Sequence, residues 1–160
     1  MTTQTTDTSV RTSIVVNAPV ERAFSVFTDD IGSWWAPGHH LLQGELAAMV
    51  FEPRAGGYLY DVATDGRECR WARVLAYEPP HRVVFSWDIN LQWELEADPA
   101  RTSEVEVRFV PDGEGRTRVE LEHRNLDRHG DGWGSMRDGV GSPDGWPMGL
   151  RRFADRLERP

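Results

Sequence analysis

The sequence predicts an α+β protein in which a curved antiparallel sheet of six to seven strands wraps around a long C-terminal helix. Three observations favour this fold class. Strand-like runs alternate with turn signals throughout residues 46–126. In the last two runs, apolar residues alternate with charged ones, as in a sheet with one covered and one solvated face. Near the C-terminus, apolar residues at helical spacing form one stripe, made of Trp146, Leu150, Phe153, Ala154 and Leu157.

The N-terminal part predicts a tail, a strand and two helices. Residues 1–11 are rich in Thr and Ser, and we expect them to form a disordered tail before a single domain that spans residues 12–158. An apolar strand follows at 13–16, and Pro19 suits the first turn of a helix because its missing N–H costs little there. The carboxylates of "DDIGSWWAPGHH" suit the start of a second, short helix, which the breaker "APG" ends.

Turn signals divide the middle of the chain into strands. Gly56 and Gly57 separate two strand-like halves, and "TDG" at 64–66 precedes the next strand. Further breaks fall at "EPP", residues 78–80, and at "PDGEGR", residues 111–116. The glycine pair lacks the wider pattern of a nucleotide-binding loop, so we interpret it as a tight turn or a bulge.

Composition and charge argue against several classes of partner. The chain is 39% hydrophobic and 28% charged, with a net charge of −8, whereas nucleic acids and anionic membranes bind a concentrated basic surface. No apolar run approaches the roughly 20 residues of a membrane-spanning helix. The N-terminus has neither the basic region nor the apolar core of a signal peptide, so we expect a cytoplasmic protein. A single cysteine, Cys69, excludes an intramolecular disulfide and any CxxC motif.

Several segments resemble those of a known family. They are "APVERAF", "EPRAGGYLYD", "WARVLAYEPPHRVVFSWDI", "SEVEVRFVPDGEGRTRVELEHRNLDRHG" and "GWPMGLRRFADRL". Over about residues 12–158, their order and spacing are similar to those of bacterial relatives of the activator of the heat-shock-protein-ninety ATPase, in the START-like (SRPBCC, helix-grip) superfamily. The resemblance implies a cavity between the sheet and the C-terminal helix. Superfamily members bind lipids, polyketides, hormones or other apolar molecules there, and some are cyclases or hydrolases.

The aromatic content fits such a cavity. The chain has seven Trp, six Phe and three Tyr residues, and each fully buried indole needs a partner for its N–H. An aromatic pocket with a few polar groups is the usual form of a small-molecule site. Periodicity leaves a solid core equally open, and the resemblance favours the cavity. The expected wall residues are Trp34, Trp35, Tyr58, Trp71, Phe85, Trp87, Trp93, Val107, Phe109, Leu121, Trp146, Leu150 and Phe153.

His123 is the candidate for acid–base chemistry. It shares a strand face with Val119 and Leu121 and is therefore expected to point inward. There it could orient a ligand or transfer a proton, because the unperturbed pKa of histidine lies near neutrality. The alternative is a buried neutral histidine that is hydrogen-bonded to a backbone carbonyl or to a Trp N–H. No nucleophile accompanies it on that face.

Arg73 is a second polar candidate. Strand parity places it with Trp71 and Leu75, where it could reach the pocket mouth and pair with an acidic group of the ligand. The alternative is a salt bridge within the protein, to Glu52, Glu78 or Asp88.

Two groups of residues carry metal-ligand side chains. They are His39, His40 and Glu45, and His123, Asp127 and His129. Neither spacing matches a common metal site, so we expect no metal and no other cofactor.

Residues 125–146 are rich in glycine, which gives the backbone freedom at an entropic cost. One interpretation is a flexible lid over the cavity mouth, with Trp133 and Met136 as its apolar contacts. The other is an irregular surface connector.

Three functions remain open. The leading hypothesis is a protein that encloses a small hydrophobic or aromatic ligand, lipid-like or polyketide-like. The second is an enzyme of the polyketide cyclase or hydrolase type with His123 as acid or base. The third is a stimulator of a chaperone ATPase, which ranks last because we expect the chain to lack the additional N-terminal domain of the eukaryotic co-chaperones. A homodimer is compatible with the resemblance, but no segment marks a dimer face.

Overall fold

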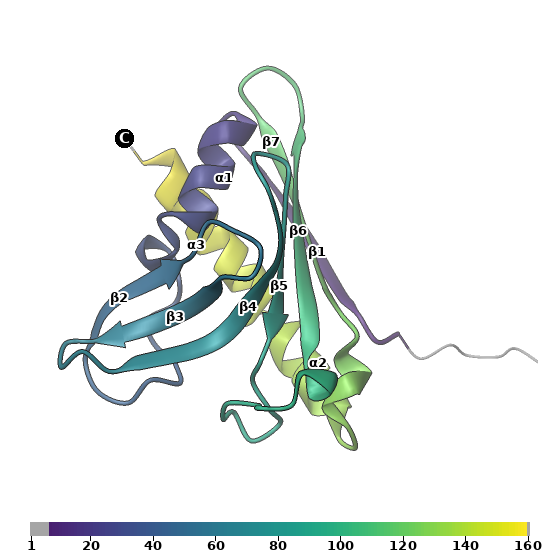
Figure 1. Ribbon diagram of the computed structural model, residues 1–160. Helices are drawn as coiled ribbons and strands as arrows, with labels where there is room; N and C mark the ends of the chain where they lie inside the picture. Colours follow the sequence, from purple (N-terminus) through teal and green to yellow (C-terminus); the bar gives the residue numbers. More distant parts are fainter. Residues whose placement is uncertain (1–6, 160) are drawn as a thin grey trace, which may run out of the picture.

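The computed structural model describes residues 7–159, and in this part of the chain an antiparallel sheet of seven strands bends around a long helix (Figure 1). In spatial order the strands are β1 (Val10–Val16), β7 (Thr117–Arg124), β6 (Ser103–Pro111), β5 (Arg82–Trp87), β4 (Glu68–Glu78), β3 (Tyr58–Ala63) and β2 (Leu46–Phe51). The helices are α1 (Val20–Thr28), α2 (Trp133–Val140) and α3 (Trp146–Glu158), with 3-10 turns η1 (Ile31–Ser33), η2 (Pro99–Arg101) and η3 (Leu126–His129). The predicted helix-grip fold is confirmed. Among the described residues, none of the helices has the length and apolar character that crossing a bilayer requires.

The buried faces predicted from alternation in β6 and β7 and from helical spacing in α3 are correct. The inward residues of the two strands are buried, namely Val105, Val107, Phe109, Val119, Leu121 and His123. The predicted stripe of α3 is buried against them, and Pro147 lies in the first turn of that helix, where its missing N–H needs no partner. Periodicity therefore predicts the covered face of the sheet.

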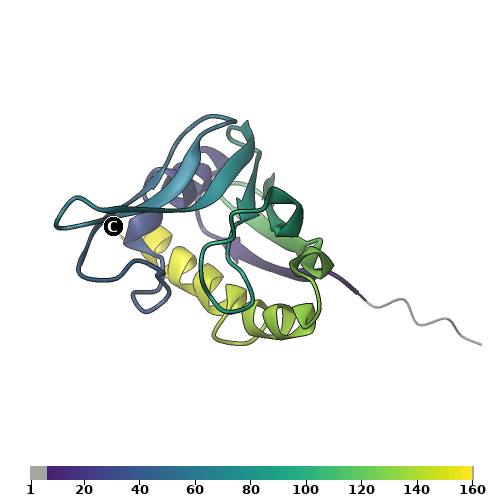
Figure 2. The ribbon, with the colours of Figure 1, turned by 60° about the horizontal axis from the view of Figure 1, so that its bottom comes forward.

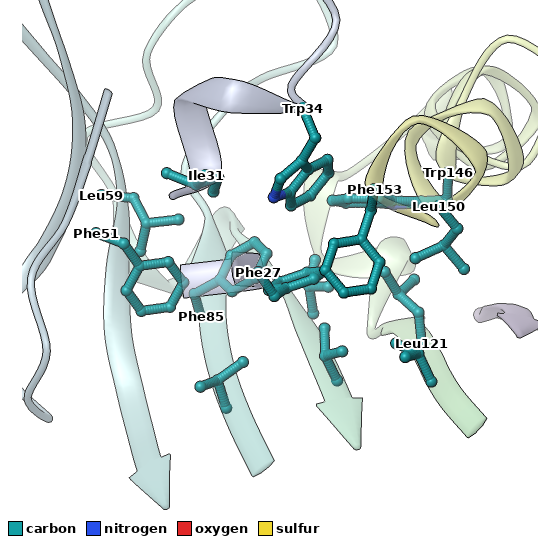
Figure 3. Close-up of a cluster of buried hydrophobic side chains, with 14 of the residues drawn as sticks. Phe27, Ile31, Trp34, Phe51, Leu59, Phe85, Leu121, Trp146, Leu150 and Phe153 are labelled. Carbon is teal, nitrogen blue, oxygen red and sulfur yellow. The ribbon is translucent and has the colours of Figure 1, made fainter. Parts of the chain in front are cut away.

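Aromatic rings fill one end of the space between the sheet and the helices (Figure 3). Phe27 of α1 has no exposed surface, and its ring centroid lies 4.8 Å from that of Trp34. The rings of Phe109 and Phe153 pack edge to face on Phe27, with centroid distances of 5.6 and 5.4 Å. We call this end the phenyl core, and its packing ties α1 and α3 to the centre of the sheet.

Strand parity is wrong in β4. Its pairing with β3 and with β5 slips by one residue at two places, next to Trp71 and next to Leu75. Because a bulge inserts an unpaired residue and changes which face later side chains take, Trp71 is buried whereas Leu75 is exposed. The two residues, and Arg73 between them, do not share one face.

Three further predictions need correction. β1 begins at Val10 rather than at residue 13, so the last residues of the predicted tail pair with β7. Residues 1–6 of that tail lie outside the described residues. The segment 125–146, interpreted as a flexible lid or an irregular surface connector, contains η3 and α2, and Met136 of α2 is buried in the core. The predicted short helix after α1 is the single turn η1.

Candidate functional site

A cavity of about 450 Å³ lies at the end of the sheet–helix space that is not occupied by the phenyl core. Its volume is within the range of roughly 300–1,000 Å³ that is typical of small-molecule sites. Four parts of the chain contribute to it: the loop after η1, the strands β3 and β4, β5 with the loop after it, and the connection from α2 to α3. The lining residues are Trp35, Gly38, His39, His40, Leu41, Asp61, Trp71, Trp87, Ile89, Trp93, Gly139, Val140, Ser142, Asp144, Gly145 and Trp146.

Four indoles contact one another in a closed cycle and form the apolar part of the cavity, which we call the four-indole wall. The ring centroid of Trp71 lies 5.2 Å from that of Trp35 and 5.7 Å from that of Trp87. Trp146 closes the cycle, because its centroid lies 5.8 Å from Trp35 and 5.6 Å from Trp87. The four rings come from the loop after η1, β4, β5 and α3. The fold therefore brings together aromatic faces from distant parts of the sequence.

A histidine–carboxylate pair forms the polar part of the cavity. His40 Nδ1 lies 2.8 Å from Asp61 Oδ2, and the two side chains are only 10% and 2% exposed. A neutral histidine that donates from Nδ1 keeps an unprotonated Nε2, and this nitrogen has no hydrogen-bond partner among the described residues. The carboxylate thus holds the imidazole in the tautomer that can accept a proton at Nε2.

The position of Asp61 has a local cause. It lies on the buried face of β3 between Leu59 and Ala63, so an acid takes an apolar position. Its Oδ1 is buried without a partner within residues 7–159. A buried oxygen without a hydrogen bond destabilises the folded protein, so a purely structural role does not explain this acid. An acid at an inward, otherwise apolar position of a strand is a signal in the sequence that could have identified this residue. His40 gives no comparable signal, because a loop brings it to the strand.

His123 lies behind the four-indole wall and is not among the lining residues of the described chain. Its Nδ1 accepts the indole N–H of Trp146 at 3.0 Å, and its Nε2 lies 2.7 Å from Ser103 Oγ. Because an indole N–H only donates, the proton of the neutral ring is on Nε2 and is donated to Ser103. Burial, together with the nearby His129, lowers the pKa of His123 to about 3. This geometry is that of the buried neutral histidine bonded to a Trp N–H.

The hydrogen-bond chain continues away from the cavity. The Ser103 hydroxyl donates to Nε2 of His129 at 2.8 Å, so the whole chain has one direction. Burial also lowers the pKa of His129. The chain fixes the orientation of the Trp146 indole, and through it one side of the four-indole wall.

The predicted wall residues divide into groups. On the cavity surface lie Trp35, Trp71, Trp87, Trp93 and Trp146. Buried in the packed interior, and not among the lining residues of the described chain, lie Trp34, Phe85, Val107, Phe109, Leu121, His123, Met136, Leu150 and Phe153. Tyr58 and Trp133 are half-buried outside the cavity, where they contact arginines, Arg70 and Arg137 respectively. Sequence reasoning missed Leu41, Ile89 and the His40–Asp61 pair, whereas the α2–α3 connection lies in the segment 125–146 that one interpretation placed at the cavity mouth.

Arg73 forms an internal salt bridge instead of reaching the cavity. Its guanidinium donates to both carboxylate oxygens of Asp88, at 3.0 and 3.1 Å, and to Thr102 Oγ1 at 3.1 Å. The described lining of the cavity contains no arginine, whereas Asp61 and Asp144 supply two carboxyl groups. Within residues 7–159 no three His, Cys, Asp or Glu side chains lie close enough together to hold a metal ion.

The family model described as "Activator of Hsp90 ATPase homolog 1-like protein" matches residues 17–158. The chain belongs to this family. No match was found among curated proteins.

Solved structures that resemble more than nine-tenths of the chain include a synthase and a resistance protein. One is Txn09, an anthrahydroquino-gamma-pyrone synthase, which is 45% identical over 92% of this chain and 95% of its own, with a TM-score of 0.64. The other is CalC, a self-sacrificing resistance protein from Micromonospora echinospora, which is 28% identical over 95% of each chain, with a TM-score of 0.63.

Proposed function

We propose that the protein binds a planar, neutral, polyphenolic ligand of the aromatic polyketide class in the cavity. The observation that carries this proposal is the four-indole wall on a cavity of about 450 Å³. Flat aromatic faces bind flat aromatic ligands well, because stacked and edge-to-face pairs add to the gain from burial. Two carboxyl groups without a described arginine disfavour an acidic ligand. The 45% identity to a synthase of aromatic pyrones supports this ligand class.

Binding is tested by titrating the protein with 1,8-dihydroxyanthraquinone and following tryptophan fluorescence. We expect saturable quenching, and at least about tenfold weaker binding of anthraquinone-2-carboxylate, since tenfold corresponds to a difference of 1.4 kcal/mol. Trp35→Leu should weaken binding. Trp133→Leu, which replaces another half-buried indole outside the cavity, is the matched control and should not. Absence of saturable quenching in the wild-type protein would contradict the proposal.

A second candidate function is catalysis of ring closure by the same site, and the His40–Asp61 pair favours it. In an aryl 1,3-diketone with an ortho hydroxyl, His40 Nε2 would remove the phenolic proton while the phenolate oxygen attacks the distal carbonyl carbon. His40 returns that proton to the new alkoxide, which gives a cyclic hemiketal. His40 Nε2 then removes one proton from the CH2 group of the former diketone, and the hydroxyl leaves with this proton as water, so the products are a γ-pyrone and water. Asp61 stabilises the imidazolium between these steps.

The catalytic candidate is tested with such a diketone as substrate. His40→Gln and Asp61→Asn should each lower kcat by about 10²–10⁴, the usual contribution of general acid–base catalysis, while the affinity for 1,8-dihydroxyanthraquinone changes little. His81→Gln, an exposed histidine in the turn between β4 and β5, is the control and should keep full turnover. Pyrone formation that is unchanged in both site variants would remove the pair from the mechanism.

A further inference from the structure

A tight hairpin formed by residues 88–96 follows β5 and carries Trp93 at its tip. The Oδ1 of Asn90 accepts the backbone N–H groups of Gln92 and Glu94, both at 2.9 Å. The carbonyl of Asn90 also accepts the N–H of Trp93 at 3.0 Å. These bonds fix the position of the tip, so the indole is presented by a defined turn.

The backbone of Trp93 is in the left-handed region, with φ of 60°, which bulky residues rarely adopt. Its side chain is also the most exposed large apolar group in the described chain, at 51%. A strained backbone and an exposed indole are both unfavourable in the empty protein. Such strain persists at sites where a ligand or a functional geometry uses it.

Trp93 lines the same cavity as the four-indole wall, but it has no ring contact with that wall among the described residues. The space of the cavity therefore lies between them. On the helix side, the Trp93 ring approaches Gly139 near the end of α2. A Cβ added to Gly139 would lie 3.6 Å from Cζ2 of Trp93. Figure 2 shows this hairpin beside the turn that joins α2 to α3.

We propose that Trp93 is a specificity-determining residue that selects ligands with several fused rings. The inner rings of such a ligand contact the four-indole wall, and an outer ring stacks on Trp93, which loses its exposure. A single-ring phenol reaches the wall or Trp93 but does not span both. This inference rests on the proposed function and adds the size class of the ligand.

The test compares a three-ring ligand, 1,8-dihydroxyanthraquinone, with a one-ring ligand, resorcinol, by titration calorimetry or ligand-observed NMR. Trp93→Ala should weaken binding of the three-ring ligand about tenfold and leave resorcinol within about twofold, because one aromatic pair is lost. Trp93→Phe should retain most of the three-ring affinity. Leu95→Ala removes a 49% exposed side chain of the same hairpin outside the cavity, and should leave both affinities within about twofold.

A second variant separates stacking from backbone strain. Trp93→Gly removes the ring and also relieves the strain of the positive φ. It should therefore bind the three-ring ligand as weakly as Trp93→Ala, but unfold at a higher denaturant concentration than Trp93→Ala.

Three outcomes would overturn the role of Trp93: an equal loss of affinity for both ligands, no loss for either, or a higher affinity of Trp93→Gly than of Trp93→Ala in step with its higher stability. If the wild-type protein binds neither ligand, the proposed function itself fails. If it binds both and Trp93→Ala binds them equally well, only the role of Trp93 fails.

Discussion

The two ends of the space between sheet and α3 are both rich in aromatic rings, yet one is solid and the other is hollow. At the phenyl core, rings from α1, β6 and α3 interlock edge to face around Phe27. At the cavity, two of the four wall indoles are held by their N–H groups: Trp35 donates to the carbonyl of His39 at 2.9 Å, and Trp146 donates to His123. The N–H of Trp87 is buried without a partner in the described part of the chain. A phenyl ring is fixed only by packing on its faces and edges, whereas an indole with a bonded N–H can leave one face open. The bonded N–H groups of Trp35 and Trp146 therefore keep part of the wall ordered beside an open cavity.

The largest expected effect is the loss of stability when a ring of the phenyl core is removed. Phe27→Ala removes a ring with no exposed surface and should lower the free energy of unfolding by about 3–5 kcal/mol in urea denaturation. Trp35→Ala at the hollow end should cost less than half as much, since that ring already lacks neighbours on the cavity side. The ligand affinity of folded protein should show the opposite order. Equal stability losses would mean that the indoles form a structural core rather than a binding wall.

An intermediate effect is the pH dependence of stability that His123 causes. This residue accepts the N–H of Trp146 in the cavity wall. The pKa of this residue is about 3 in the folded protein and near 6.5 in the unfolded chain. Between these values the unfolded state binds a proton that the folded state does not, so stability falls as pH falls, by at most about 1.4 kcal/mol per pH unit. The contribution is complete above about pH 6.5. His123→Gln should flatten this part of the profile in urea denaturation between pH 6.5 and 3, and parallel profiles would exclude His123 as its source.

The smallest expected effect is the change in stability when either of two acids, Asp61 or Asp88, is made neutral. Asp61→Asn replaces a buried charge by a neutral amide whose oxygen still accepts from His40, and should raise the free energy of unfolding by about 1 kcal/mol. Asp88→Asn removes a carboxylate whose two oxygens both bind Arg73, and should lower it by about 1 kcal/mol, since that pair is partly exposed. Thermal unfolding of the two variants checks the signs. A destabilised Asp61→Asn would indicate that the acid is structural and not part of the site.

Sequence patterns predict the fold well where the backbone is regular. Alternation along β6 and β7 and helical spacing along α3 identify buried faces, because each pattern depends only on local geometry. The same reasoning fails in β4, where bulges shift the parity and move Arg73 to a salt bridge with Asp88. It also misses α2, whose glycines favour a loop although Met136 anchors it in the core.

The candidate site is less predictable than the fold because it depends on contacts between distant segments. The tryptophans of the wall are conspicuous in the sequence, but their parity does not distinguish the cavity ring of Trp35 from its buried neighbour Trp34. That division depends on where the loop after η1 turns. The His40–Asp61 pair arises in the same way, from a loop residue that meets an inward residue of β3.

The one-directional chain from Trp146 through His123 and Ser103 to His129 limits how this protein can be redesigned for larger guests. Each member requires the donor or acceptor that precedes it, so replacing one residue alone leaves its neighbour with an unmet polar group. Leu41 and Ile89 border the same space and belong neither to that chain nor to the four-indole wall. Enlarging the binding volume should therefore begin at these two positions, while the four linked residues are either kept or exchanged as one set.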